Sequence, residues 1–184
     1  IHIGENGIAT VYVGKAEMGQ NIRTSLAQVI AEELPVPSDS IQLVMGDTDL
    51  TPYDAGTFGS RTTPFTAPIL RKAAATLRGI LMDLAAEKWK VDRGELEARD
   101  GKIFNKNNRE SLSFGQLTEG REILKTIRND ITTIAPSAWK IAGTSMPKVD
   151  GRSFVTGKHR YSTDMKLPGM LYGETIETLT AELA

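Results

Sequence analysis

Two short stretches of the sequence carry residue types that could bind an anionic ligand. The first is Glu17-Met18-Gly19-Gln20, between a predicted strand and a predicted helix. Backbone N–H groups at a helix start attract anions, and the Gln20 amide can both donate and accept hydrogen bonds. The alternative is an ordinary helix entry, in which Glu17 favours the positive end of the helix dipole. The spacing alone favours that ordinary entry.

The second stretch is the loop from residue 46 to residue 64, rich in Gly, Thr, Asp and Pro. It exceeds the about 12–15 residues beyond which loops in compact domains are usually functional or disordered. Its last part, Gly59-Ser60-Arg61-Thr62-Thr63, combines a glycine that permits close approach, three hydroxyls, and an arginine that can pair with phosphate. No Walker pattern or GxGxxG is present. A polar loop with Thr63 or Thr66 as N-cap of the next helix is an equally good interpretation.

Other candidate groups do not form a metal site. His2 and His159 are far apart and share no metal-ligand spacing. Three acidic residues of the long loop resemble a loose calcium loop, but they lack the Gly and the bidentate Glu at the required offsets. They are Asp47, Asp49 and Asp54. We therefore expect neither a zinc nor a calcium site.

The composition excludes several classes of function. The 184 residues carry a net charge of −1, which argues against a general binder of nucleic acid or membrane surfaces. No apolar run approaches the roughly 20 residues that cross a bilayer. Without cysteine the chain cannot ligate an iron–sulfur cluster or use a thiol nucleophile. The missing cysteines leave the cytoplasm and the periplasm both open. The first residues contain no starting Met and no targeting peptide, so we expect the chain to begin inside a domain.

Hydrophobic periodicity predicts the elements that must position these stretches. It indicates a strand over 8–13, a helix from Ile22 to Leu34, and a strand over 41–45. A longer helix is expected from about Ala67 to Lys90, with Leu77 and Leu81 on its apolar face. The adjacent acids Glu32-Glu33 are most simply a solvated edge.

The second half of the chain has weaker patterns. Asp100-Gly101 predicts a hairpin turn within 96–104, and Ser113 is expected to cap a short helix. Residues 121–136 are predicted to be strand or irregular, and 136–143 a linker into a new module. Short strands are expected around Val155, Tyr161 and Met170-Leu171-Tyr172. The predicted fold class is α+β: a small mixed β-sheet packed with two main helices, followed by a β-rich segment.

Three motifs in order resemble one family. The first runs from Gly14 to Gln20 and on to Leu34, and the second comprises Gly46-Asp47-Thr48 and residues 56–63. Both resemble the molybdopterin-binding domain of the xanthine dehydrogenase and aldehyde oxidase family. The third runs from Gly143-Thr144-Ser145-Met146-Pro147-Lys148-Val149-Asp150 to Gly173 and resembles the start of the family's a/b hammerhead domain. The expected domains are therefore 1–140, the N-terminal part of the molybdopterin-binding domain, and 141–184, a truncated hammerhead. Their order is similar to that in the isoquinoline 1-oxidoreductase type of large (beta) subunit.

The resemblance implies a function in an oxidoreductase. Such subunits hold molybdopterin cytosine dinucleotide and hydroxylate N-heterocycles or aldehydes with oxygen from water. Their electrons leave through a [2Fe-2S] small subunit. By resemblance, Gly19 and Gln20 would lie near the metal or its pterin. Contacts to the pyrophosphate or nucleotide would come from Gly59, Ser60, Arg61, Thr62 and Thr63. No residue of this chain is expected to ligate the metal directly.

The chain also departs from the family pattern. Asn21 stands where the family usually has Gly, and Glu174-Thr175-Ile176-Glu177-Thr178-Leu179 replaces an Arg-Pro segment. The glycine-rich pterin motif and the C-terminal catalytic Glu of full subunits are missing. We therefore expect a bacterial-type fragment that is inactive and holds no cofactor alone, and that needs the remainder of the large subunit. The alternative is a non-catalytic scaffold or interaction remnant, which could self-associate through unpaired strand edges.

Overall fold

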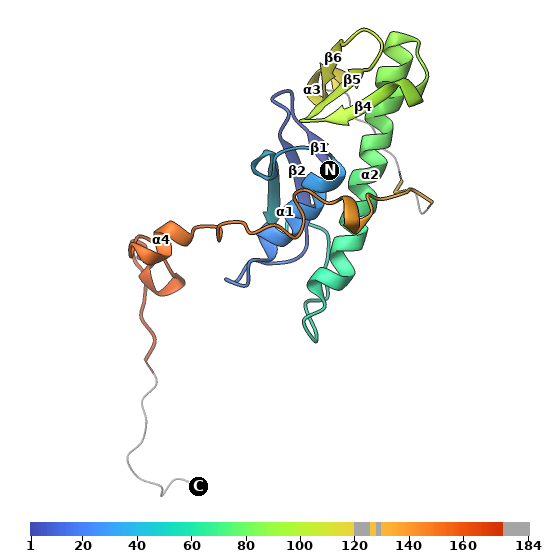
Figure 1. Cartoon of the computed structure of the whole chain (residues 1–184). Coiled ribbons are helices and arrows are strands. Elements are labelled where there is room, and N and C mark those ends of the chain that lie inside the picture. Colours follow the sequence, from blue (N-terminus) through green and yellow to red (C-terminus); the bar gives the residue numbers. More distant parts are fainter. Residues whose placement is uncertain (120–125, 128–129, 175–184) are drawn as a thin grey trace, which may run out of the picture. The chain divides into compact units, whose positions relative to one another are not determined.

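The computed structural model describes residues 1–119, 126–127 and 130–174 (Figure 1). The chain divides into two compact units, Ile1–Val149 and Asp150–Ala184. The first unit contains two three-stranded sheets and both long helices. The mixed α+β class predicted from the sequence is confirmed, and the expected division at residues 140 and 141 stays a prediction.

The first sheet is built around a strand–helix–strand unit. Its order is β1 (His2–Ile3), β2 (Ala9–Val13), β3 (Ile41–Met45). β1 pairs antiparallel with β2, whereas β2 and β3 are parallel. Helix α1 (Ile22–Glu33) makes the crossover that a parallel pair requires. Alternate residues of β2 are buried, as its period-two pattern predicts, and they form one core with Leu26 and Ile30 of α1.

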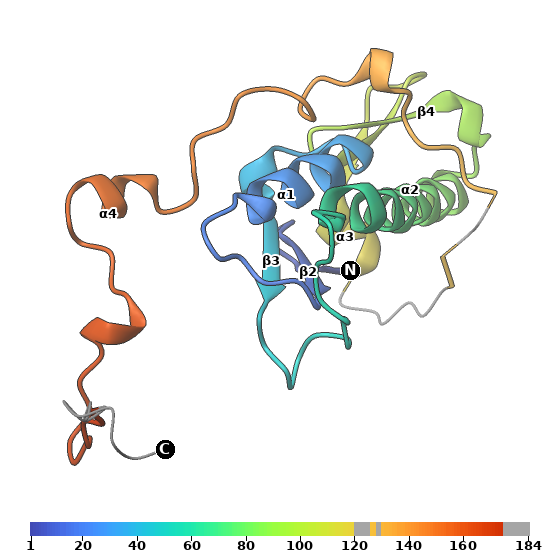
Figure 2. The ribbon, with the colours of Figure 1, turned by 90° about the horizontal axis from the view of Figure 1, so that it is seen from below.

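Helix α2 (Thr62–Trp89) packs side by side with α1 (Figure 2). It begins at Thr62 rather than at the expected Ala67, because two prolines are accommodated near its start. Pro64 lies in the first turn, where a missing N–H costs nothing, and Pro68 lies inside the helix. Thr63 and Thr66 are therefore helical residues, and their predicted role as N-cap is wrong. Leu81 is fully buried, as expected for the apolar face.

The second sheet packs near the C-terminal half of α2. It contains β4 (Leu96–Arg99), β5 (Lys102–Asn105) and β6 (Ser111–Ser113), all antiparallel, and α3 (Phe114–Thr118) follows. Asp100 and Gly101 both have positive φ, at 50° and 71°, so they form the predicted hairpin turn. Ser113 caps α3, and Gln116 completes a capping box. Short 3-10 turns occur at Ser38–Ser40 and Arg93–Glu95.

The predicted solvated edge at Glu32 and Glu33 is wrong. Glu33 is fully buried and Glu32 is 5% exposed. Glu33 accepts hydrogen bonds from Arg71 (3.0 and 2.8 Å) and forms an ion pair with Arg78 (3.2 Å), both on α2. It also accepts the backbone N–H of Ile134 at 3.0 Å. A buried carboxylate is tolerated because several donors compensate for its desolvation.

Residues 134–144 cross both helices and are called the strap below. Glu32 accepts the backbone N–H groups of Lys140 (3.0 Å), Ile141 (2.6 Å) and Ala142 (3.0 Å). Gln28 donates to the carbonyls of Ile141 and Thr144, at 2.9 Å each. The strap includes a 3-10 turn at Pro136–Ala138. The segment predicted to be a linker is thus fastened to α1.

The second unit contains α4 (Gly151–Val155) and a 3-10 turn at Ser162–Asp164. Its described residues, 150–174, form no strand, so the short strands expected around Val155, Tyr161 and residues 170–172 are wrong for them. The physical reason is that strands need a paired neighbour. The expectation for 121–136 lies partly outside the described residues. Among the described residues, no helix is long and apolar enough to cross a membrane.

Replacing Glu33 should destabilise the first unit. Glu33→Gln keeps the shape of the side chain but removes the charge that Arg71 and Arg78 share. Removing one partner of a buried pair typically costs about 3–5 kcal/mol. We expect that loss in the free energy of unfolding measured with urea, whereas Glu87→Gln, at an exposed position of α2, should leave it nearly unchanged. Equal midpoints for both variants would show that the ion pairs do not hold the two helices together.

Candidate functional site

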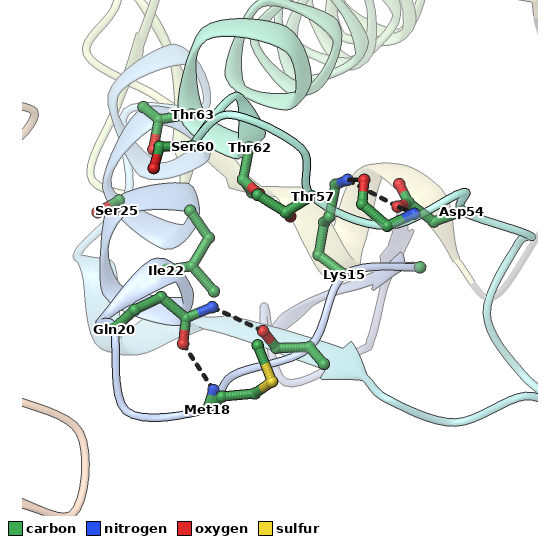
Figure 3. Close-up of a pocket in the computed structure, with 13 residues that line it drawn as sticks. Lys15, Met18, Gln20, Ile22, Ser25, Asp54, Thr57, Ser60, Thr62 and Thr63 are labelled. Atoms are coloured by element: carbon green, nitrogen blue, oxygen red, sulfur yellow. Dashed lines mark hydrogen bonds and ion pairs between the residues drawn. The ribbon is translucent and has the colours of Figure 1, made fainter.

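A cleft of about 650 Å³ lies where the loop before α1 and the loop before α2 come together (Figure 3). This volume is within the range of small-molecule sites. The cleft brings Gln20 of the first motif together with three predicted residues of the second, Ser60, Thr62 and Thr63. The other three predicted residues do not line it. They are Gly19, Gly59 and Arg61.

The Gln20 side chain holds the first loop in shape. Its Oε1 accepts the backbone N–H of Met18 at 2.6 Å, and its Nε2 donates to the carbonyl of Ala16 at 2.9 Å (Figure 3). Lys148 donates to the carbonyl of Gly19 at 2.5 Å. Gln20 therefore lines the cleft with its amide engaged on both sides by its own loop.

The start of α1 already holds an anion, the carboxylate of Glu17. It accepts the backbone N–H groups of Gly19 (2.8 Å), Asn21 (3.1 Å) and Arg23 (2.9 Å). These are the donors that a bound phosphate would need at this helix start. The structure therefore shows the ordinary helix entry at α1, with Glu17 at the helix start. Gln20 lines the neighbouring cleft instead.

The contacts of Glu17 also set its protonation. Burial alone would raise its pKa, but the N–H donors of Arg23, Gly19 and Asn21, with the nearby charge of Lys148, outweigh that effect. The pKa of Glu17 consequently lies below its ordinary value of 4.5. The carboxylate stays charged at neutral pH, where it neutralises the start of α1.

Asn21 stands where the resembled family usually has Gly, and its backbone conformation explains how the chain tolerates this difference. Its backbone has φ 66° and ψ 23°, the left-handed region that glycine adopts at no cost. Among other residues, Asn enters this region most readily. The tight turn after Gln20 is therefore retained without a glycine.

An ion pair ties the two cleft loops to each other. Lys15 donates to Asp54 at 2.6 Å and to the carbonyl of Gly56 at 2.9 Å. The hydrogen bond from Lys15 holds the pKa of Asp54 below its ordinary value. Gly14 adds a steric constraint, because a Cβ there would lie 2.2 Å from the carbonyl oxygen of Pro52. In the sequence, Gly14 and Lys15 directly after a predicted strand are the one signal that could have indicated this contact between the loops.

The start of α2, in contrast, has unused backbone donors. Among the described residues, no acceptor is bonded to the N–H of Thr62 or Thr63. The Thr62 hydroxyl is buried against that of Thr57, so it is not available to a ligand. Ser60 just before the helix has φ 56°, a conformation that costs a non-glycine residue about 1–3 kcal/mol and is concentrated at functional sites. This helix start can receive an anion.

Arg61 lies at the rim of this helix start rather than in the cleft. It is the N-cap of α2 and is exposed, and its guanidinium carbon is 5.6 Å from the centroid of the Phe65 ring. Sequence reasoning missed Ser25 and Ile22, which line the cleft from α1, because only the packing of α1 against α2 places them there. Among the described residues, no group of three or more acidic or histidine side chains could hold a metal ion.

Comparison with known proteins points to one family. Residues 1–162 match the family model described as molybdopterin cofactor-binding domain. The chain is 36% identical to a subunit of nicotinate dehydrogenase from Pseudomonas putida over 176 residues, which are 96% of this chain and 15% of that protein. It is 26% identical to the beta subunit of isoquinoline 1-oxidoreductase from Brevundimonas diminuta over 94% of this chain and 27% of that protein. The chain thus spans less than a third of the length of these relatives.

Two solved structures agree with these matches. The CO dehydrogenase from Oligotropha carboxidovorans superposes with a TM-score of 0.57 and 32% identity, covering 64% of this chain and 15% of that chain. Quinoline 2-oxidoreductase from Pseudomonas putida 86 gives a TM-score of 0.54 at 27% identity, over 62% of this chain and 15% of that chain.

The lowered pKa of Glu17 predicts a specific pH dependence. A carboxyl whose folded pKa is depressed stabilises the fold above its unfolded value, here about 4.5, and loses that contribution as pH falls through the lower folded value. Glu17→Gln should therefore reduce stability by about 0.5–2 kcal/mol at pH 7, as for the loss of a helix cap. The difference from the unsubstituted chain should vanish below the folded pKa.

Urea unfolding at several pH values measures this difference. Glu97→Gln, at an exposed position of β4, serves as the control and should show no such dependence. A difference between Glu17→Gln and the unsubstituted chain that persists unchanged at low pH would mean that the carboxylate does not cap α1.

Proposed function

Because the chain belongs to the molybdopterin cofactor-binding domain family, as found in large subunits of xanthine dehydrogenase-type enzymes, we propose that its cleft binds the phosphate-bearing end of a molybdenum cofactor. The observation that carries the proposal is the difference between the two helix starts. Glu17 fills the start of α1, whereas the N–H groups of Thr62 and Thr63 on α2 have no partner among the described residues.

The donors at the start of α2 fit a pyrophosphate. Oriented N–H groups and the helix dipole favour an anion, the dipole by about 0.3–1 kcal/mol when exposed. The hydroxyls of Ser60 and Thr63 line the same cleft and can donate to phosphate oxygens. Arg61 at the rim would add a charge-assisted hydrogen bond by turning away from Phe65. Gly59, with φ 61°, permits the turn that presents Ser60.

The first loop would face the pterin end of the cofactor. Gln20 and Met18 line the cleft beside the α2 start, and Gly19, with φ 98°, shapes the turn between them. When bound, the molybdenum would supply hydroxylation of an N-heterocycle or aldehyde carbon with oxygen from water. This chain's own residues would bind and orient the cofactor. We propose the cytosine dinucleotide form of the cofactor.

The proposed whole protein is a large subunit that works with others. The relatives are named as subunits, among them one of nicotinate dehydrogenase and the gamma subunit of a 6-hydroxypseudooxynicotine dehydrogenase complex. We propose that this chain acts with the remainder of a large subunit and with a [2Fe-2S] small subunit, since it has no cysteine to hold a cluster itself. Nucleic acid is not a proposed partner.

Arg61 tests the proposal in a full-length large subunit that contains this sequence. Arg61→Ala should lower the molybdenum and the released cytidine nucleotide per protein chain, because hydrogen bonds to charged groups contribute about 1.5–3 kcal/mol. Arg99→Ala is a matched control, since Arg99 is also exposed and lies 4.6 Å from the centroid of an aromatic ring, that of Phe104. Full cofactor loading of Arg61→Ala would make Arg61 a surface residue without a role in binding.

The 184-residue chain alone should show no hydroxylase turnover with N-heterocycles or aldehydes, whatever the electron acceptor. The reason is that it lacks residues that the family's reaction needs, the base and the cluster ligands. The measurement is product formation by the purified chain, together with its molybdenum content. Turnover by a preparation free of longer subunits would contradict the expectation. A chain that assembles with a partner yet never carries molybdenum would favour the alternative role, a non-catalytic scaffold.

A further inference from the structure

One peptide group of the first loop is not held by the loop itself. Glu17 accepts the N–H groups of the two flanking peptides, those of Gly19 and Asn21. Among the described residues, no acceptor is bonded to the N–H of Gln20, which belongs to the peptide between Gly19 and Gln20. Gly19 has φ 98°, and glycine adopts many backbone conformations at similar energy. The local sequence therefore leaves the direction of the Gly19 carbonyl open.

Lys148 supplies a contact to this peptide from a distant part of the chain. Its Nζ donates to the Gly19 carbonyl at 2.5 Å, across 129 positions of sequence. The ammonium also interacts electrostatically with the Glu17 carboxylate. Gly19 is thus held by an anion at its N–H and by a cation at its carbonyl, and hydrogen bonds to charged groups are stronger than those between neutral groups. The carbonyl direction that faces Lys148 is favoured over the others.

The backbone around Lys148 lies against the first turns of α1. Its neighbours Pro147 and Val149 border a small cleft of about 200 Å³ together with Arg23 and Thr24 of that helix. The strap, which precedes this segment, is itself hydrogen-bonded to α1. The Lys148 side chain is therefore presented to the first loop by a backbone whose position the strap already restricts.

We propose that Lys148 is a positioning residue, which sets the direction of the Gly19–Gln20 peptide and thereby the side of the cleft that Gln20 and Met18 form. Lys148 does not line the cleft, so it acts through the turn and not by touching a ligand. The inference rests on the proposed function in one respect: a cofactor in the cleft would meet the surface that Lys148 holds in shape.

The first test compares NMR spectra of variants of the ¹⁵N-labelled 184-residue chain. In Lys148→Met the backbone N–H signal of Gln20 should shift and broaden or split. The reason is that other directions of the peptide should gain about 2–10-fold in population, the range for one lost hydrogen bond. The side-chain amide signal of Gln20 should change with it. Lys148→Arg keeps a positive charge and N–H donors, so it should restore both signals.

Lys140→Met is the matched control. Lys140 is also exposed, and its replacement removes one positive charge from the strap, but its bond to Glu32 comes from the backbone and is retained. This variant should leave the Gln20 signals unchanged. The signals of β4 and β5 should be the same in all variants, which shows that each is folded. Gln20 signals in Lys148→Met that match those in Lys140→Met would overturn the proposal.

The second test uses a full-length large subunit that contains this sequence. Lys148→Met should carry less molybdenum per protein chain than Lys140→Met, and Lys148→Arg should recover the loss. Full molybdenum in Lys148→Met would overturn the role of Lys148 in shaping the cleft for a cofactor. The proposed function fails separately: full cofactor loading of Arg61→Ala would count against the phosphate site and leave the effect of Lys148 on the Gln20 signals standing.

Discussion

The arrangement of this chain depends on two buried carboxylates at the end of α1. Glu33 accepts from Arg71 and Arg78, which fixes α1 against α2, and Glu32 accepts three successive N–H groups of the strap. Charges in a low-dielectric interior are tolerated only when their donors are correctly placed, so these contacts favour the observed packing of α1, α2 and the strap. The cleft lined by Gln20, Ser60, Thr62 and Thr63 lies where this packing brings the starts of the two helices together.

This packing places the starts of α1 and α2 beside one cleft, and the two starts differ in whether an anion already accepts their N–H groups. Glu17 supplies an anion at the start of α1 that is charged at neutral pH. The N–H groups of Thr62 and Thr63 at the start of α2, in contrast, have no acceptor in the described part of the chain, and they follow Ser60, whose φ is positive. Because the Glu17 carboxylate repels a second anion at the start of α1, we propose the start of α2 as the position of a ligand's anionic group. The ion pair between Lys15 and Asp54 holds the loops that carry these two starts at a fixed separation.

The sequence predicted the parts of the fold whose causes are local. Strands β2 and β3, helix α1 and the Asp100-Gly101 hairpin follow from periodicity and turn chemistry, and the Ser113 cap follows from residues three positions apart. The burial of Glu33 could not be predicted, because its partners lie 38, 45 and 101 positions away. The start of α2 was misplaced because prolines normally end a helix.

For the site, the two stretches named from the sequence both border one cleft, and their role in binding stays a prediction. Gln20, Ser60, Thr62 and Thr63 meet in one cleft, although nothing in their spacing shows that their loops are adjacent. Arg61, the N-cap of α2, lies at the rim, because its guanidinium lies over the Phe65 ring and not in the cleft. The described residues 150–174 show that strand-forming residues do not form strands without neighbours to pair with.

The position of the cofactor's phosphates is measured most directly by a crystal structure of a full-length large subunit that contains this sequence, with its molybdopterin cofactor bound. We expect phosphate oxygens within about 2.7–3.2 Å of the backbone nitrogens of Thr62 and Thr63. Glu17 should still accept the N–H groups of Asn21 and Arg23 in that structure. Phosphates at the start of α1 in place of the Glu17 carboxylate, or a cofactor bound away from the start of α2, would contradict the assignment.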